Sequence, residues 1–522
     1  MVWAYFNQRA ANAEARRRPL AWGFLKRLGN GFSIDLRSLA AMRIGLALIV
    51  LWETGVALSN ARLFLTDDGV LPRELLFAHH WFGQGAWSLH AWSGALEWQV
   101  VLLTCQALAA VCLLLGWRTW LANALCWVFI CSLETRNPVL GNGSDAVVRL
   151  LLFWSLCLPL GARCSLDARA GKVAAWRGEI VSLPGACLLL QIAFVYWFSV
   201  TCNTDPAWWW GDGSALHRAL SLDLYARPFG VWLRGYEGLC AALTCFTVWM
   251  EIVSPLIAFL PFWRTVWRLA AVGWFFLFHA GIAVSMNIGP FPYVMMVAWL
   301  AFLPKAFWER LMPERRVNLA AFVPAIGSFG RGLRLVKNAW CAACLAFVFM
   351  WNLRGTNFAY WHRYLPEAVH PLAFALRLDQ YWGMFSPCPT PEDGWFVLRA
   401  ALSDGTEVDL LRAGSALDWR KPALVSAAFK DERWQKYLMN LWLQTFSHLR
   451  PAFGNAIARE WNATHGTLNQ VVAWQLWFML ERRDKSRDPK PTEPRAILLQ
   501  EGQCLPQYRA RDLVQSTSPS LH

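Results

Sequence analysis

Residues 269–304 have the sequence LAAVGWFFLFHAGIAVSMNIGPFPYVMMVAWLAFLP, which contains no Asp, Glu, Lys or Arg. About 20 apolar residues in a helix span the hydrocarbon core of a bilayer. Residues 98–117 and 180–203 form two more runs without a charged residue, each at least about that long. These three runs decide the fold class, and they predict a polytopic α-helical membrane protein.

The composition of the whole chain agrees with that prediction. Of its 522 residues, 56% belong to the set AVILMFWYC and only 16% are charged. Such a composition excludes intrinsic disorder and is unlike that of an ordinary soluble enzyme. In a soluble protein the net charge of +14 would suggest a nucleic-acid partner. Here the basic residues follow the membrane segments, so we expect the lipid bilayer as a partner and no nucleic acid.

Nine hydrophobic segments can be marked along the chain, and we expect about nine transmembrane helices. Their approximate bounds are 39–58, 98–115, 120–133, 146–160, 183–200, 239–262, 269–286, 291–303 and 340–353. The third, fourth and eighth segments are short for a span. The third and fourth, or the seventh and eighth, could therefore form a tight or re-entrant hairpin instead.

Lys and Arg are distributed unevenly over the loops between these segments. They cluster before the first segment, after the fourth and after the eighth, whereas the alternate loops hold few. The positive-inside rule then puts the N-terminus in the cytoplasm and, after nine crossings, the C-terminal region outside. We expect a cytoplasmic basic segment at 1–37, a transmembrane domain at 38–308, a cytoplasmic loop and last transmembrane helix at 309–353, and an external domain at 354–522.

The C-terminal region differs from the rest in its pattern. Strand-forming residues at 395–402 are followed by Asp404-Gly405, a hairpin signal, and by a second strand at 407–411. Residues 421–446 predict one or two helices, whereas 471–480 is a strand or a helix. A small α+β domain is therefore expected there. Cys388 and Cys504 are its only cysteines, and they could pair if this side is oxidising.

Polar residues within or at the outer ends of membrane segments are the candidate site residues. A charge at mid-bilayer costs ~2.5 to 3.5 kcal/mol on insertion scales, so it needs a partner or a wet cavity. Asp145 and Arg149 are four residues apart and could pair on one helix face. The alternative is that all these groups make interhelical hydrogen bonds without chemistry. The candidates are Arg136, Asn137, Asp145, Arg149, Asn203, Asp205, Trp208, Glu251 and His279.

Several short motifs occur in an order that resembles a known family. They are SLAAMRIGLALIVLWE at 38–53, TDDGVLPR at 66–73, WSLH at 87–90, GWRT at 116–119, RNP at 136–138, Asp145 with Arg149, CSLD at 164–167, His279, GPFP at 289–292 and FLP at 302–304. Together they resemble the horizontally transferred transmembrane (HTTM) domain of the vitamin K-dependent gamma-carboxylase superfamily, in its bacterial form. QYWGMFSP at 380–387 resembles the start of the external domain that often follows it.

The resemblance implies nine spans, an external C-terminal part and a location in the bacterial inner membrane. In the carboxylase, a hydroquinone is oxidised to an epoxide, and an alkoxide formed on the way takes a proton from a substrate glutamate. The family removes the hydroquinone proton with a lysine just after the fifth span. Asn203 stands at the matching position and cannot accept that proton. The family's functional histidine falls near Ser144, also without a counterpart.

Two function classes therefore stay open. The favoured one is a protein that binds a quinone-like or lipidic ligand in an outward-facing polar pocket, or that anchors a periplasmic protein partner. Arg136, Asn137, Arg149, Asn203, Trp208 and His279 would contribute to binding. The alternative is a membrane enzyme that modifies a quinone or lipid, with Asp145, Asp205 or Glu251 as the base. The sequence has no metal-ligand spacing, so no metal is expected.

Overall fold

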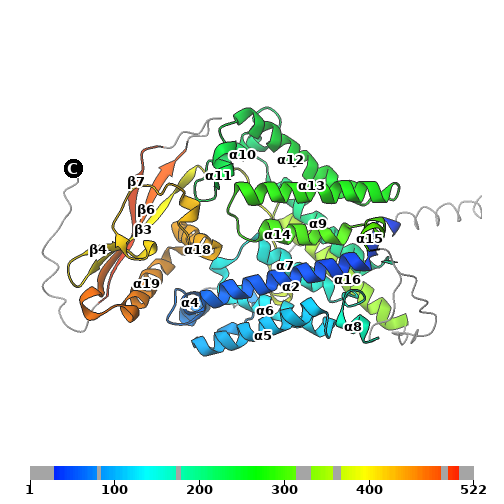
Figure 1. Cartoon of the computed structure of the whole chain (residues 1–522), viewed down its shortest axis with the longest axis horizontal. Helices are drawn as coiled ribbons and strands as arrows, with labels where there is room; N and C mark the ends of the chain where they lie inside the picture. Colours follow the sequence, from blue (N-terminus) through cyan, green and yellow to red (C-terminus); the bar gives the residue numbers. More distant parts are fainter. Residues whose placement is uncertain are drawn as a thin grey trace, which may run out of the picture.

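A computed structural model describes residues 29–78, 84–171, 178–312, 331–356, 366–483 and 492–504. Figure 1 shows long helices side by side in a bundle, with a β-sheet and further helices at one end. The described residues thus form a helical membrane protein with a small C-terminal sheet domain. Most of the expected basic segment 1–37, the loop 313–330 and the charged stretch 484–491 lie outside the described residues.

Within the described residues, six helices are both long and apolar enough to cross a membrane. They are α2 (Leu36–Ser59), α5 (Leu96–Leu115), α9 (Leu183–Cys202), α12 (Glu237–Ala258), α13 (Arg264–Ser285) and α16 (Arg331–Arg354). A bent pair adds at most one more span, because α14 (Phe291–Trp299) and η5 (Leu300–Phe302) meet α15 (Lys305–Leu311) at 96°. The described residues therefore hold six spans, or up to seven.

The expected count of nine spans is wrong for the described residues, although each of the nine segments contains a helix. The difference lies mainly in α6 (Thr119–Arg136) and α7 (Gly143–Ser155). With 13 residues, α7 rises only ~20 Å, which is short of a ~30 Å hydrocarbon core. Every α7 residue after Gly143 is buried, among α6, α9 and α14. It is a core helix of the bundle. Because other helices surround it, it need not be as long as the hydrocarbon core is thick.

Local sequence explains where the helices begin and end. Asp35 caps α2 by accepting a hydrogen bond from the Arg37 amide, and Ser182 caps α9 in the same way through Gly185. Gly116 ends α5 with φ of 67°, packed so closely against Ser165 that a Cβ would not fit. Glycine is the residue that adopts this conformation without a steric penalty.

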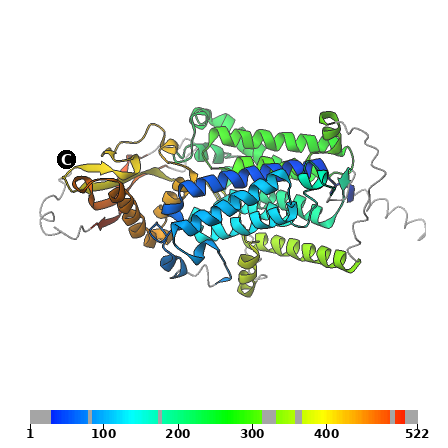
Figure 2. The same ribbon diagram turned by 60° about the horizontal axis from the view of Figure 1, so that its bottom comes forward.

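The two ends of the bundle carry different structures. The short strands β1 (Ile34–Asp35) and β2 (Glu179–Ile180) pair at the end where α2 begins. The C-terminal sheet lies at the opposite end (Figure 1). Figure 2 shows α16 along one side of the bundle, where it packs against α9.

The C-terminal domain is built on a five-stranded antiparallel sheet in the order β5-β4-β3-β6-β7. Its strands are β3 (Glu392–Leu402), β4 (Glu407–Asp409), β5 (Ser415–Ala416), β6 (Val471–Arg482) and β7 (Arg495–Gln503). The predicted hairpin at Asp404-Gly405 is confirmed between β3 and β4, where Gly405 has φ of 87°. The ambiguous segment 471–480 is strand β6. The predicted helices in 421–446 reduce to α18 (Glu432–Trp442) and short 3₁₀ turns.

The domain packs on the bundle through a shared apolar core. Tyr437 of α18 and Phe453 of α19 (Arg450–Thr464) are fully buried with Phe64 and Leu71 from the segment after α2. Trp382, which precedes the sheet, belongs instead to the core of the bundle. The domain is therefore fixed to the bundle by packing as well as by the chain. Cys388 and Cys504 do not form a disulfide with each other.

Candidate functional site

A cavity of about 560 Å³ lies between α9, α12 and α13, and the short helices α10 (Ala215–Leu220) and α11 (Pro228–Leu233) also line it. This volume falls within the ~300 to 1,000 Å³ of typical ligand sites. Most of its walls are apolar. We refer to it as the α12–α13 cavity.

Helical spacing explains why α12 and α13 form two of its walls. Leu239, Leu243, Thr247 and Glu251 are four residues apart along α12, and all four line the cavity. Residues at this spacing lie on one face of a helix. On α13, two rows of residues with the same spacing line the cavity. One row is Trp274, Phe278 and Ile282, and the other is Leu277, Gly281 and Ser285.

Glu251 is the one ionisable residue among the described residues that line the α12–α13 cavity. Among the described residues, none makes a hydrogen bond or ion pair with its carboxylate. Pro255 lies four residues later in the same helix. Because proline has no amide hydrogen, it cannot donate to the Glu251 backbone carbonyl. The side chain and the backbone of Glu251 thus both present acceptors in an apolar setting.

The segment after α9 and residues 384–385 form another part of the cavity wall. Asn203 accepts a hydrogen bond from the Ser386 hydroxyl, and Trp208 Nε1 donates to the Pro387 carbonyl at 3.0 Å. Met384 and Phe385 line the cavity beside them. Asn203 and Trp208, two of the predicted binding residues, therefore lie at the site.

One side of the cavity reaches the exposed surface of the bundle. Trp232 of α11 is 54% exposed and Leu277 of α13 is 71% exposed, and both line the cavity. Trp232 also contacts Phe229 and Tyr236, with ring centroids 5.3 and 5.0 Å away. Such aromatic groups are typical of the level where a membrane meets water. The cavity wall is thus continuous with an apolar outer face.

His279 lies on α13 but does not line the cavity. Its Nε2 is 2.8 Å from the Tyr196 hydroxyl, which also accepts a hydrogen bond from Trp299 Nε1 at 2.8 Å. All three side chains are at most 3% exposed. The arrangement links α9, α13 and α14. His279 therefore makes an interhelical hydrogen bond, which is the structural role considered above for polar residues in membrane segments.

Asp145 lies elsewhere, at the junction between the bundle and the C-terminal domain. Arg433 of α18 donates to both Asp145 oxygens, at 2.7 and 2.8 Å, and also to Glu53 of α2. Burial alone would lower the pKa of Arg433, but the two carboxylates hold it well above its ordinary value. An adjoining cavity of about 50 Å³, lined by Asn137 among others, has room only for a few waters. We refer to this region as the Arg433 junction.

Arg149 has partners other than the expected one. It donates to Glu134 at 2.6 Å, to Asp379 at 3.0 Å and to the Arg377 carbonyl at 3.0 Å. The predicted pair with Asp145 does not form, because Asp145 at the N-terminus of α7 is turned toward Arg433. Each residue of the expected pair has its own counter-charge.

The remaining candidates serve local structure. Arg136 donates to the carbonyls of Leu71 and Thr66 at 2.9 and 3.2 Å, and Asn137 donates to the Phe64 carbonyl at 3.0 Å. These bonds fix the segment that follows α2. Asp205 caps the 3₁₀ turn Pro206–Trp208 by accepting from the Ala207 amide at 2.9 Å, and it does not line the α12–α13 cavity.

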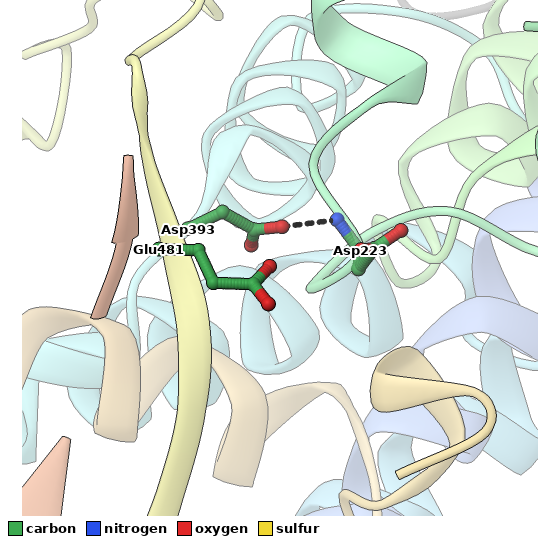
Figure 3. A group of neighbouring side chains, drawn as sticks. All are labelled: Asp223, Asp393 and Glu481. Carbon is green, nitrogen blue, oxygen red and sulfur yellow. Dashed lines mark hydrogen bonds between the residues drawn. The ribbon is translucent and has the colours of Figure 1, made fainter. Parts of the chain in front are cut away.

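A cluster of carboxylates at the domain boundary has no signal in the sequence. Asp223 precedes α11, Asp393 is on β3 and Glu481 is its cross-strand partner on β6. Figure 3 shows the Asp223 amide donating to Asp393, at 2.6 Å. Their carboxylate oxygens lie within 4.8 Å of one another, close enough for a metal ion. Three cations already neutralise them, because Lys421, Arg234 and Arg483 lie 2.7, 2.6 and 3.0 Å from Asp223.

The pKa values in this cluster diverge. Burial and the neighbouring Asp223 raise the pKa of Asp393 to about 6. Burial acts on Asp223 in the same direction, but hydrogen bonds from Lys421 and Arg234 outweigh it and lower the pKa. The arrangement can take up one proton near neutral pH, and its balanced charge disfavours a metal ion.

The structure therefore unites three of the predicted residues, Glu251, Asn203 and Trp208, at one cavity and distributes the others among structural contacts. Comparison with protein-family models, with curated proteins and with solved structures finds no match for this chain.

Proposed function

We propose that this integral membrane protein binds a quinone-like or other lipidic ligand in the α12–α13 cavity. The observation that carries the proposal is a cavity of about 560 Å³ whose apolar wall continues onto exposed apolar residues of the bundle. Apolar surface is stabilised by an apolar occupant, in proportion to the area removed from water. A ligand with a long apolar chain could enter from the side without crossing water.

We also propose the orientation that the loop charges predict, with the N-terminus cytoplasmic and the C-terminal domain periplasmic in a bacterial inner membrane. The separation of β1 and the C-terminal sheet to opposite ends of the bundle supports it (Figure 1). We further propose that the chain is a member of the HTTM family, on the basis of the sequence motifs given above. Cysteine-accessibility labelling of intact cells at exposed positions of the C-terminal domain would test the orientation.

The ligand proposal can be tested by filling the cavity. Gly281 lines it, and a Cβ built on Gly281 meets nothing within 4 Å. Gly281→Leu should therefore fold and occupy ligand space. Gly273 lies on the same helix with equally open surroundings but does not line the cavity, so Gly273→Leu is the matched control.

The measurement is mass spectrometry of lipids extracted from the purified protein in nanodiscs of defined lipid composition. We expect a host-derived lipidic molecule that copurifies with the natural chain and with Gly273→Leu and is severalfold depleted in Gly281→Leu. Equal amounts in all three proteins would contradict the proposal, because they would indicate lipids bound outside the cavity.

Catalysis on the same ligand is the second candidate. Glu251 favours it, because an unpartnered carboxylate in an apolar cavity is the kind of group that can act as a base. Asp145 has a strong ion pair, and Asp205 does not line the cavity. Incubation with a reduced quinone in the presence of dioxygen as the oxidant would show oxidation or epoxide formation that Glu251→Gln abolishes. Bound quinone without turnover would rule this candidate out.

A further inference from the structure

We infer that the ligand of the α12–α13 cavity is a cationic amphiphile, with one ammonium-type positive charge held by Glu251 and an apolar chain along the cavity walls. This inference rests on the proposed function and narrows its ligand class. Three independent features of the described residues carry it: the charge of the lining, the surplus of acceptors around Glu251, and the aromatic wall of α13.

The first feature is a carboxyl group without a counter-charge. The described lining contains Glu251 and no Lys, Arg or His. An ionised carboxylate in an apolar site is strongly destabilised unless an opposite charge or hydrogen bonds compensate for it. The other buried carboxylates described above have such partners in the protein, as Asp145 and Glu53 do in Arg433. An anionic lipid headgroup would add a second negative charge without any cation to receive it.

The second feature is the surplus of acceptors on this part of α12. Pro255 deprives the Glu251 carbonyl of its usual amide donor. The neighbouring Ile252 carbonyl accepts a hydrogen bond from Trp197 Nε1, at 3.2 Å. The Glu251 carboxylate also has no donor among the described residues. An ammonium group supplies up to three donors and no acceptor, so it complements such a surface.

The third feature is the aromatic wall that α13 contributes to the same cavity. Trp274 and Phe278 line it with stacked rings, 6.1 Å between centroids and 14° between planes. Ring faces of this kind attract a cation. Trp274 Nε1 is also buried without a partner among the described residues, so it can donate a hydrogen bond to an acceptor on the ligand.

The depth of the cavity sets how the ligand is oriented. Glu251 is fourteen residues from the start of α12, whereas Leu239, at the start, and Trp232 are exposed at the rim. A residue fourteen positions along a helix lies ~21 Å from its start. The charged head therefore lies deep in the cavity, and the chain extends toward the exposed residues that line it.

The test compares three probes with the same chain: hexadecylamine, hexadecanol and hexadecyl sulfate. Purified full-length protein in nanodiscs is incubated with each, and bound probe is quantified by mass spectrometry after gel filtration. We expect hexadecylamine to bind about tenfold more tightly than hexadecanol, as one charge-assisted hydrogen bond would give, and the sulfate to bind least.

Two variants assign this preference to Glu251. Glu251→Gln should lower hexadecylamine binding to the level of hexadecanol and leave hexadecanol binding unchanged. Glu251→Asp, which keeps the charge, should retain a preference for the amine and shows that the site tolerates substitution. An amine preference that is absent from the natural chain, or that survives Glu251→Gln, would overturn the inference.

The same experiment separates this inference from the proposed function. Gly281→Leu should weaken all three probes together if the cavity is the binding site. Binding of hexadecanol that Gly281→Leu removes, without any preference for the amine, would support the cavity and overturn the cationic ligand. Recovery of a neutral quinone as the native ligand would have the same meaning. Failure of every probe would overturn both proposals.

Discussion

The Arg433 junction and the α12–α13 cavity treat buried charge in opposite ways. At the junction, one guanidinium lies between two carboxylates from different helices and also donates to the Leu140 carbonyl, at 3.0 Å. In the cavity, Glu251 has no partner among the described residues. The difference separates groups that hold the fold together from a group that is available to a ligand. Removing one member of a buried ion pair strongly destabilises the fold. A buried charge without a partner destabilises the folded state even in the natural chain.

The largest effect should come from breaking the junction. Arg433→Met leaves Glu53 and Asp145 without a counter-charge, and removing one member of a buried ion pair costs ~3 to 5 kcal/mol. Thermal unfolding in detergent should show the loss. Arg420→Met, at a side chain that is 88% exposed, should leave the melting temperature unchanged.

A compensating variant sharpens the interpretation of that loss. Combining Arg433→Met with Glu53→Gln and Asp145→Asn removes the negative charges along with the positive one. Most of the stability should return, because the penalty arises from uncompensated charge and not from lost packing. If the triple variant remained as unstable as Arg433→Met, the charge would not be what holds the two regions together.

A smaller effect is expected at Arg149, where geometry matters as well as charge. Its three nitrogens donate to three separate acceptors, on Glu134, Asp379 and Arg377. Lysine keeps the charge but cannot reach all three in this fixed arrangement, so Arg149→Lys should lower the free energy of unfolding by about 2 kcal/mol. Arg482→Lys, at an exposed ion pair, is the matched control and should have no measurable effect. An unchanged melting temperature for Arg149→Lys would mean that charge alone suffices.

The acidic cluster at the domain boundary should respond to pH. The folded pKa of Asp393, raised to about 6 from 3.8, means that the folded state binds this proton more tightly than the unfolded state. Stability should therefore rise as pH falls through 6 toward 4. The natural chain should gain roughly 1 kcal/mol relative to Asp393→Asn between pH 7 and pH 5. Asp223, with a lowered pKa, titrates below this window.

A series of chemical unfolding curves at several pH values tests whether stability rises as the pH falls. Asp404→Asn is the control, because Asp404 is exposed and hydrogen bonds from Thr406 lower its pKa further below this window. A difference between the natural chain and Asp393→Asn that stays constant, or that shrinks as the pH falls, would contradict the raised pKa.

Much of the membrane part could be predicted from the sequence, since apolar runs without charge identify helices through length alone. The number of spans could not. Whether α7 faces lipid or other helices depends on what surrounds its buried residues, such as Leu152, and no local pattern records that. The same holds for the sheet. Asp404-Gly405 indicates a hairpin by itself, whereas the pairing of β3 with β6 joins residues far apart in the chain.

The candidate site was predictable to a similar degree. The spacing of Leu243, Thr247 and Glu251 along α12 already puts them on one helix face, so Glu251 could be identified as a charge within a membrane helix. The partner of Asp145 could not be found, because Arg433 is 288 residues away in a domain that must first fold and dock. Sequence identifies which charges need a partner, and only the tertiary structure decides which ones receive one.

The smallest effect on stability is expected from a substitution at Glu251. Whether stability rises or falls there is the most direct test of the difference between the Arg433 junction and the α12–α13 cavity. In protein stripped of lipid, Glu251→Gln replaces an uncompensated carboxylate with a neutral group of the same shape. The free energy of unfolding should stay unchanged or rise by up to ~1 kcal/mol, since no native partner is lost. Glu53→Gln, the same substitution at the Arg433 junction, should lower it. Melting temperatures of the two variants should thus move apart, and a clear loss of stability in Glu251→Gln would mean that the carboxylate holds the fold together, as Glu53 does.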